Sequence, residues 1–306
     1  MYKNLLFSLL ILAGIQLFSG CSGCSESRKS SDKDALTLPD SLISDAPLKL
    51  SEEIMNEVIG NISSPVEMAS LFKNSGVEFT QRIMNNPDNV SGYETSFKRA
   101  LNLGVFSADL GYINTFDKNN IVVSYLLAVK NLADGIRVGQ FFDFNALRRM
   151  ASSSSNLDSL MEMSVTSFNK MDSYLREQNR SNVSSLIVTG AWIEGLYIAS
   201  SIVRETGDKE LANRIAEQKN IINILEIILS NYSSEPNFGE LVADIEELKK
   251  AYANISITTE LGEPQRIEKD GSLIFIQDEI STVHYTEEDL NNIMTIIEKT
   301  RNKIVE

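Results

Sequence analysis

Residues 181–203, SNVSSLIVTGAWIEGLYIASSIV, decide the fold of this chain. The stretch is long enough to cross a bilayer, which takes about 20 apolar residues. However, Glu194 is its only charged residue and lies near its middle, where a charge in a membrane span is costly. Asn182, Thr189 and several serines add further polarity. We therefore predict a helix over residues 182–206 that is buried inside a water-soluble helical domain.

A second stretch, residues 100–116 (ALNLGVFSADLGYINTF), has the same character, with Asp109 as its only charged residue. Apolar side chains recur at helical spacing and define two stripes. The stripes consist of Phe97, Leu101, Val105, Ala108, Tyr112 and Phe116, and of Leu103, Phe106, Leu110 and Ile113. Two stripes indicate a helix that is covered on more than one side, and we place it at residues 92–116.

Similar patterns predict helices over most of the remaining chain. Pro65 opens one helix at the position that proline tolerates, and Ser51 caps an earlier one. Further helices are expected at residues 120–137, 143–152, 157–178, 209–231 and 239–255. The fold class predicted is mainly α, either a compact multi-helix bundle or an array of helical hairpins.

The end of the chain departs from this pattern. Residues 265–269 and 272–276 flank Asp270-Gly271, a strong signal for a small β-hairpin. Alternation at Ile255, Ile257 and Thr259 suggests another strand. We predict a β-ribbon over residues 255–283, followed by a final helix that opens with a capping box at Thr286 and ends near Ile304.

The start of the chain indicates export. Lys3 precedes an uncharged apolar run over residues 4–18, which leads into Phe18-Ser19-Gly20-Cys21. Such a segment is typical of a cleaved signal peptide, predicted here over residues 1–20. Small residues before a cysteine are similar to a bacterial lipobox, which makes Cys21 the expected site of lipidation.

The following segment, residues 21–48, is rich in serine and charge and is predicted to be a disordered tether. Cys24 could compete for acylation, but Cys21-Ser22-Gly23 is a poorer lead-in. A redox role for the C-x-x-C pattern at these cysteines would need a flanking strand and helix, which a flexible leader lacks. Residues 49–306 are then expected to form one helical domain, with the β-ribbon inserted before the last helix.

The amino-acid composition of the chain argues against several classes of function. The chain has 28 basic and 42 acidic residues, a net charge of −14, which argues against nucleic acid as a partner. His284 is the only histidine, so a histidine-rich metal site is impossible and a serine–histidine–acid triad is poorly supported. No nucleophile-elbow motif or glycine-rich phosphate loop is present. We assign no catalytic residue, no metal and no cofactor.

One arrangement of acidic and aromatic residues is a candidate functional or structural site. Asp109 and Glu194 are each followed three positions later by a tyrosine on the same helix face, Tyr112 and Tyr197, and Trp192 lies beside Glu194. Glycines flank both acids and permit close approach of a backbone or a ligand. These glycines are Gly104, Gly111, Gly190 and Gly195.

Three interpretations of these residues stay open. In the first, Asp109 and Glu194 accept hydrogen bonds or meet Arg99 or Arg137, and so fix the register of the helices. In the second, the acids and the three aromatic residues line a cleft for a small ligand. In the third, two facing carboxyl groups hydrolyse a glycoside.

The segments 100–104, 107–112 and 189–197 resemble a set of uncharacterised helical lipoproteins of Gram-negative bacteria. The resemblance implies a fold and a location, with no assigned activity. We therefore expect a protein anchored to the outer membrane by lipid on Cys21, facing the periplasm or the exterior. Its expected role is non-catalytic binding or scaffolding, with an unknown envelope protein or small molecule as partner. A small-ligand receptor and a carbohydrate-active hydrolase are the alternatives.

Overall fold

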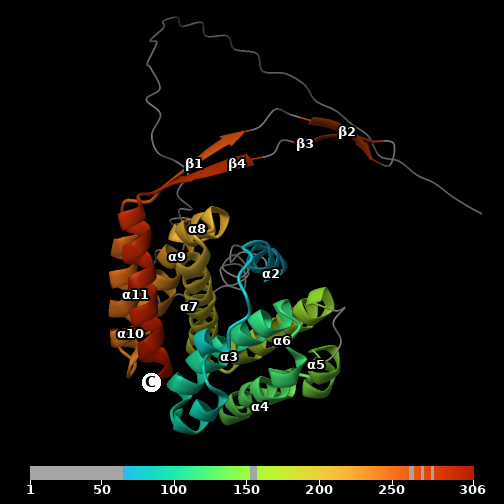
Figure 1. Cartoon of the computed structure of the whole chain (residues 1–306). Coiled ribbons are helices and arrows are strands. Elements are labelled where there is room, and N and C mark those ends of the chain that lie inside the picture. The colour runs from blue at the N-terminus through green and yellow to red at the C-terminus, as the bar shows by residue number, and fades with distance from the viewer. Residues whose placement is uncertain (1–64, 152–156, 262–264, 270–271, 277–278) are drawn as a thin grey trace, which may run out of the picture. The chain divides into compact units, whose positions relative to one another are not determined.

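The computed structural model describes residues 65–151, 157–261, 265–269, 272–276 and 279–306 (Figure 1). Within these residues the chain is mainly helical, which confirms the predicted fold class. The α-helices are α2 (Pro65–Asn74), α3 (Ser96–Thr115), α4 (Asn119–Gly135), α5 (Phe144–Ala151), α6 (Leu157–Glu177), α7 (Ser181–Thr206), α8 (Lys209–Ala216), α9 (Lys219–Ser230), α10 (Phe238–Ala251) and α11 (Glu287–Val305). Short 3₁₀ helices lie at Gln81–Ile83, Pro87–Gly92 and Gly139–Phe141.

Helix α7 packs against α3, α6, α8, α9 and α11. Among the described helices, only α7 is long and apolar enough to cross a bilayer, and 78% of its most apolar window is buried inside the structure. Glu194, near its middle, is fully buried as well. The helices around α7 therefore account for its composition.

Glycines set the distance between α3 and α7. A Cβ atom at Gly104 would lie 2.0 Å from the carbonyl oxygen of Ile187, and one at Gly190 would lie 2.0 Å from that of Leu101. No real Cβ atom comes that close to a carbonyl oxygen, so the two backbones touch at these positions because both residues are glycines. Close backbone approach, one of the roles predicted for the glycines, is confirmed at these two positions.

The predicted helix over residues 209–231 is wrong as a single element. The structure has two helices there, α8 and α9, and the break falls at Glu217 and Gln218. Gln218 is buried, accepts a hydrogen bond from the Trp192 Nε1–H at 3.0 Å and donates one to the Arg214 carbonyl at 3.3 Å. These bonds hold the side chain of Gln218 inside the fold and fix the position of the break.

The C-terminal strands form two two-stranded antiparallel sheets (Figure 1). Strand β1 (Ser256–Leu261) pairs with β4 (Glu279–His284), and β2 (Gln265–Lys269) pairs with β3 (Ser272–Ile276). The register of β2 with β3 brings Lys269 opposite Ser272, which leaves a two-residue connection as predicted. Strand β4 was not predicted, because EISTVH lacks strict alternation.

The capping box predicted for the last helix is confirmed. The Thr286 hydroxyl accepts a hydrogen bond from the Asp289 N–H at 3.1 Å, and an Asp289 carboxylate oxygen accepts one from the Thr286 N–H at 3.1 Å. Several predictions lie outside the described residues. They are the signal peptide over 1–20, the lipid on Cys21, the role of Cys24, the tether over 21–48, the helix opening at Ser51 and the Asp270-Gly271 turn.

Candidate functional site

The crossing of α3 and α7 brings Asp109 and Glu194, hereafter the acid pair, together in the core. Both side chains are fully buried. The two carboxyl groups act on each other electrostatically, because the charge of Glu194 raises the pKa of Asp109. Whether these two acids face each other could not be known from spacing alone.

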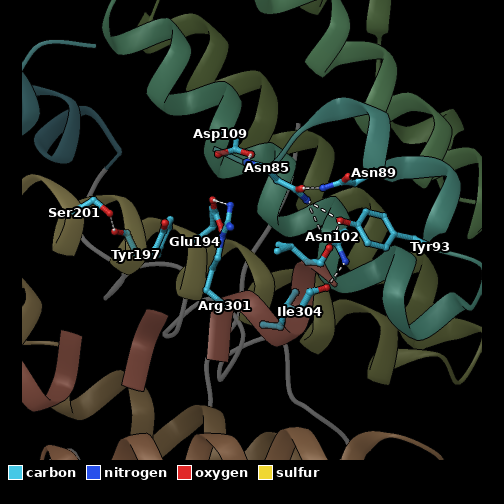
Figure 2. Close-up of polar contacts among 11 residues, drawn as sticks. Asn85, Asn89, Tyr93, Asn102, Asp109, Glu194, Tyr197, Ser201, Arg301 and Ile304 are labelled. Carbon is cyan, nitrogen blue, oxygen red and sulfur yellow. Dashed lines mark hydrogen bonds and ion pairs between the residues drawn. The ribbon is translucent and has the colours of Figure 1, made fainter. Parts of the chain in front are cut away.

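A guanidinium from the last helix completes the arrangement (Figure 2). Arg301 on α11 donates from Nε to Oε2 of Glu194 at 2.8 Å and from Nη2 to Oε1 at 3.0 Å. Its Cζ lies 4.5 Å from the centre of the Tyr197 ring, a cation–π contact. Both Glu194 oxygens are therefore occupied by one bidentate partner.

The two oxygens of Asp109 have different surroundings. Oδ2 accepts a hydrogen bond from the Asn85 backbone N–H at 3.1 Å. Within the described part of the chain, no N–H or O–H donor reaches Oδ1. Oδ1 is thus a buried oxygen without a hydrogen-bond partner among the described residues, a setting that disfavours a charged carboxylate.

Burial and the nearby charges affect the pKa values of the two acids differently. Burial raises the pKa of the Asp109 carboxyl well above its usual range, and the adjacent Glu194 charge raises it further. Burial also raises the pKa of Glu194, but Arg301 opposes that increase through hydrogen bonds and charge. Asp109 therefore holds its proton more firmly than Glu194, whose two oxygens pair with Arg301.

A chain of amides extends this network to the end of α11 (Figure 2). The Asn85 side-chain amide donates to the Tyr93 hydroxyl at 2.9 Å and to Oδ1 of Asn102 at 3.2 Å. Tyr93 donates to the Val305 carbonyl at 3.0 Å, and Asn102 donates to the Ile304 carbonyl at 2.8 Å. Carbonyls in the last turn of a helix lack intrahelical partners, so these bonds anchor the end of α11 in the core.

The structure brings only some of the predicted residues together. Tyr197 joins the acid pair through Arg301, whereas Tyr112 lies elsewhere. The Tyr112 hydroxyl accepts from the Thr80 N–H at 3.3 Å, and its ring stacks on Phe79 with centres 5.3 Å apart. Trp192 is also separate, because its indole N–H is bonded to Gln218.

The predicted arginine partners were wrong. Arg99 donates from Nε to the Tyr93 carbonyl at 2.8 Å, and Arg137 is exposed. Arg301 was missed, although the sequence contains a signal for it. Leu290, Ile293, Ile297 and Ile304 form the buried stripe of α11, and Arg301 occupies a position on that stripe where spacing predicts an apolar residue.

A small pocket opens beside Trp192, with a volume of about 70 Å³. It is lined mainly by apolar groups of α2, α7 and α8. The lining residues are Met68, Ala191, Trp192, Gly195, Leu196, Ala199, Arg214, Ile215 and Gln218. The acid pair is not among them, so the predicted cleft that combines acids with Trp192 is not formed.

Within the described ranges, no cluster of three or more histidine, cysteine, aspartate or glutamate side chains is arranged to hold a metal ion. His284 lies at the end of β4, exposed, with Nε2 3.2 Å from the Thr258 hydroxyl. Chemically, the buried network can fix three helices relative to one another. Comparisons of the chain with protein-family models, with curated proteins and with solved structures return no match.

Proposed function

We propose that this chain is a lipid-anchored protein of the bacterial cell envelope with a non-catalytic binding or scaffolding role. Residues 1–20 direct its export, and acyl chains on Cys21 attach it to the outer membrane. The apolar run over residues 4–18 and the small residues before Cys21 support this location. The net charge of −14 supports a partner other than nucleic acid.

The observation that best supports the non-catalytic role is that the acid pair is buried and bonded to other groups of the protein. Glu194 offers both oxygens to Arg301, and Asp109 accepts a hydrogen bond from the Asn85 N–H. Both acids lie fully buried in the core, out of contact with solvent. A group that must bind a substrate or move a proton to one needs access to it.

The same geometry weakens the hydrolase alternative. Glycosidases hold their two carboxyl groups about 5–10 Å apart, because the scissile bond, and in inverting enzymes a water, lies between them. Both acids are fully buried and Glu194 is bonded to Arg301 through both oxygens, so a sugar has no access to either carboxyl group. The pair therefore fits a structural role better than acid–base catalysis.

One specific observation supports the small-ligand alternative, namely the pocket at Trp192. Its mainly apolar lining and its volume of about 70 Å³ suit a single small apolar group. A ligand there would raise the melting temperature of the wild-type protein. Replacement of Gly195 by leucine would fill the pocket and remove that shift, whereas replacement of Gly111 by alanine, where a Cβ atom meets no described atom within 4 Å, would retain it.

The anchor is tested by paired cysteine variants in cells grown with an alkyne-labelled fatty acid. We expect the label on wild type and on Cys24→Ser, and its loss from Cys21→Ser. Intact-protein mass spectrometry should give a mature chain that begins at Cys21. Label that follows Cys24, or a full-length unlabelled chain, would contradict the proposal.

The non-catalytic role is tested with Asp109→Asn. Asparagine keeps the shape and hydrogen bonds of a protonated aspartate but cannot exchange a proton with a substrate. We expect the same cross-linked partners in intact cells for wild type and Asp109→Asn. A hydrolytic activity of the purified wild type that disappears in a stably folded Asp109→Asn protein would overturn the proposal.

A further inference from the structure

An apolar surface lies on α4 and the start of α5. Val123 and Leu127 are four residues apart on α4 and are 42% and 55% exposed. Phe142 and Phe144, both half-buried, follow with ring centres 5.7 Å apart. The Lys130 ammonium lies 5.6 Å from the Phe144 ring centre, which joins the two groups into one surface. We call Val123, Leu127, Phe142, Phe144 and the exposed side of α5 the α4–α5 patch.

The charge of this region is opposite to that of the whole chain. Residues 119–151 contain four basic and two acidic side chains, a net charge of +2, in a chain of net charge −14. Arg148 and Arg149 are adjacent and exposed in the last turn of α5. Helix α5 itself has no acidic residue. An apolar surface with a basic edge is thus present on an otherwise acidic protein.

We propose that the α4–α5 patch rests on the surface of a bilayer that contains anionic phospholipids. The exposed Val123 and Leu127 insert at the boundary of headgroups and acyl chains, the half-buried phenylalanines widen the apolar surface, and nearby arginines pair with lipid phosphates. The complementary charge selects the bilayer over a partner as acidic as this chain itself. The inference rests on the proposed lipid anchor.

The lipid anchor allows a patch of low affinity for the bilayer to hold the domain against it. The tether predicted over residues 21–48 would have an r.m.s. end-to-end distance of about 30 Å, which would keep the domain near the lipid. Tethering turns contact with the bilayer into an intramolecular event at high effective concentration. A patch that could not bind free vesicles firmly can then decide which face of the tethered domain meets the membrane.

The test uses the full acylated chain in vesicles of phosphatidylethanolamine and phosphatidylglycerol. A fluorophore is attached to Leu127→Cys or, as a matched control, to Ile227→Cys on α9, both in a Cys24→Ser background. Ile227 is also an exposed large apolar residue, at 37%. Spin-labelled lipids in the bilayer quench a fluorophore that touches it. We expect several-fold stronger quenching at position 127 than at position 227.

Charge variants give the second measurement. Arg149→Glu should lower the fraction of domains in contact with the bilayer about tenfold, because it replaces an attractive charge by a repulsive one. Lys209→Glu, an equal charge change at the exposed start of α8, should leave quenching at position 127 unchanged. Vesicles of phosphatidylcholine alone should give weak quenching. Thermal unfolding of each variant shows that the domain stays folded.

Equal quenching at positions 127 and 227, or quenching that Arg149→Glu leaves intact, would overturn the proposal. Protection of Leu127→Cys in intact cells without quenching by lipids would also overturn it, in favour of a protein partner. Failure of the anchor is recognised separately, by the absence of fatty acid mass on Cys21. In that case the non-acylated chain is added to the same vesicles at high lipid concentration, and the same two comparisons decide.

Discussion

One guanidinium, that of Arg301, holds both carboxylate oxygens of Glu194, at 2.8 and 3.0 Å, across 107 residues of sequence. The side chain of Glu194 is fully buried and that of Arg301 is 9% exposed. Burial of two charges is costly, and the cost is recovered only while both are present and well oriented. The stability of the fold therefore depends on the contact between α7 and α11 far more than on any surface ion pair.

Replacement of Arg301 by methionine should lower the free energy of unfolding by about 3–5 kcal/mol, because Glu194 would keep a buried charge without a partner. Chemical denaturation of the purified domain measures the change. Lys299→Met on the same helix is the control, since its ion pair with Glu247 is about half exposed, is screened by solvent and should contribute little. Similar losses for the two variants would contradict the assigned role of Arg301.

Asp109→Asn should change the pH dependence of stability. Because the pKa of Asp109 is raised well above its ordinary value of 3.8 in the folded state, the folded protein binds more protons than the unfolded chain above that pH. The free energy of unfolding should then fall as pH rises from 3.8 through the folded pKa. Asparagine does not titrate, so the variant should lose most of this slope and be the more stable form at high pH.

Denaturation series from acid to mildly alkaline pH measure both slopes. Glu194→Gln is the informative companion, since it removes the negative charge that raises the pKa of Asp109 and leaves Arg301 as its neighbour. In that variant Asp109 should ionise more readily and its contribution to the slope should shrink. A wild type whose stability rises with pH over the same window would refute the protonation assigned here.

Gly104→Ala should destabilise the protein by about 2–3 kcal/mol, because the new methyl group meets the Ile187 carbonyl and forces α3 and α7 apart. Gly111→Ala on the same helix meets no described atom within 4 Å and should stabilise by about 0.5–1 kcal/mol through helix propensity. Thermal melts of the two variants compare them directly. Equal effects of the two substitutions would show that the crossing at Gly104 is not close.

Thr286→Ala should cost about 1 kcal/mol, because it removes the capping box that opens α11. Thr286→Ser keeps the hydroxyl and should restore most of the loss. Hydrogen exchange at the Asp289 amide is the local measurement, since that N–H bonds the Thr286 hydroxyl. Unchanged exchange in Thr286→Ala would rule out this cap.

The sequence was sufficient for the elements whose signal is local. Periodicity around Leu101 and Val105 located α3, Asp270-Gly271 located the β2–β3 hairpin, and Thr286 located the start of α11. Two glycines that approach a backbone were also recognised, because acids and glycines interrupt otherwise apolar stripes. Each of these signals lies within a few residues of the feature that it predicts.

The arginine that pairs with Glu194 could not be predicted, because it lies far from Glu194 in the sequence. Arg99 and Arg137 were the predicted partners, whereas the actual partner of Glu194 lies on α11, 107 residues further along the chain. The break at Gln218 depends on Trp192 in the same way. Helical periodicity continues through both α8 and α9, so only the tertiary hydrogen bond reveals where the chain turns.

The position of Arg301 late in the chain has a consequence for biosynthesis. A ribosome adds about 5–20 residues per second, so the 107 residues between Glu194 and its counter-charge take about 5–20 s to make. Until then the α3–α7 crossing cannot dehydrate its carboxyl groups at low cost. The core of the nascent domain therefore stays hydrated and open until the final helix has been synthesised.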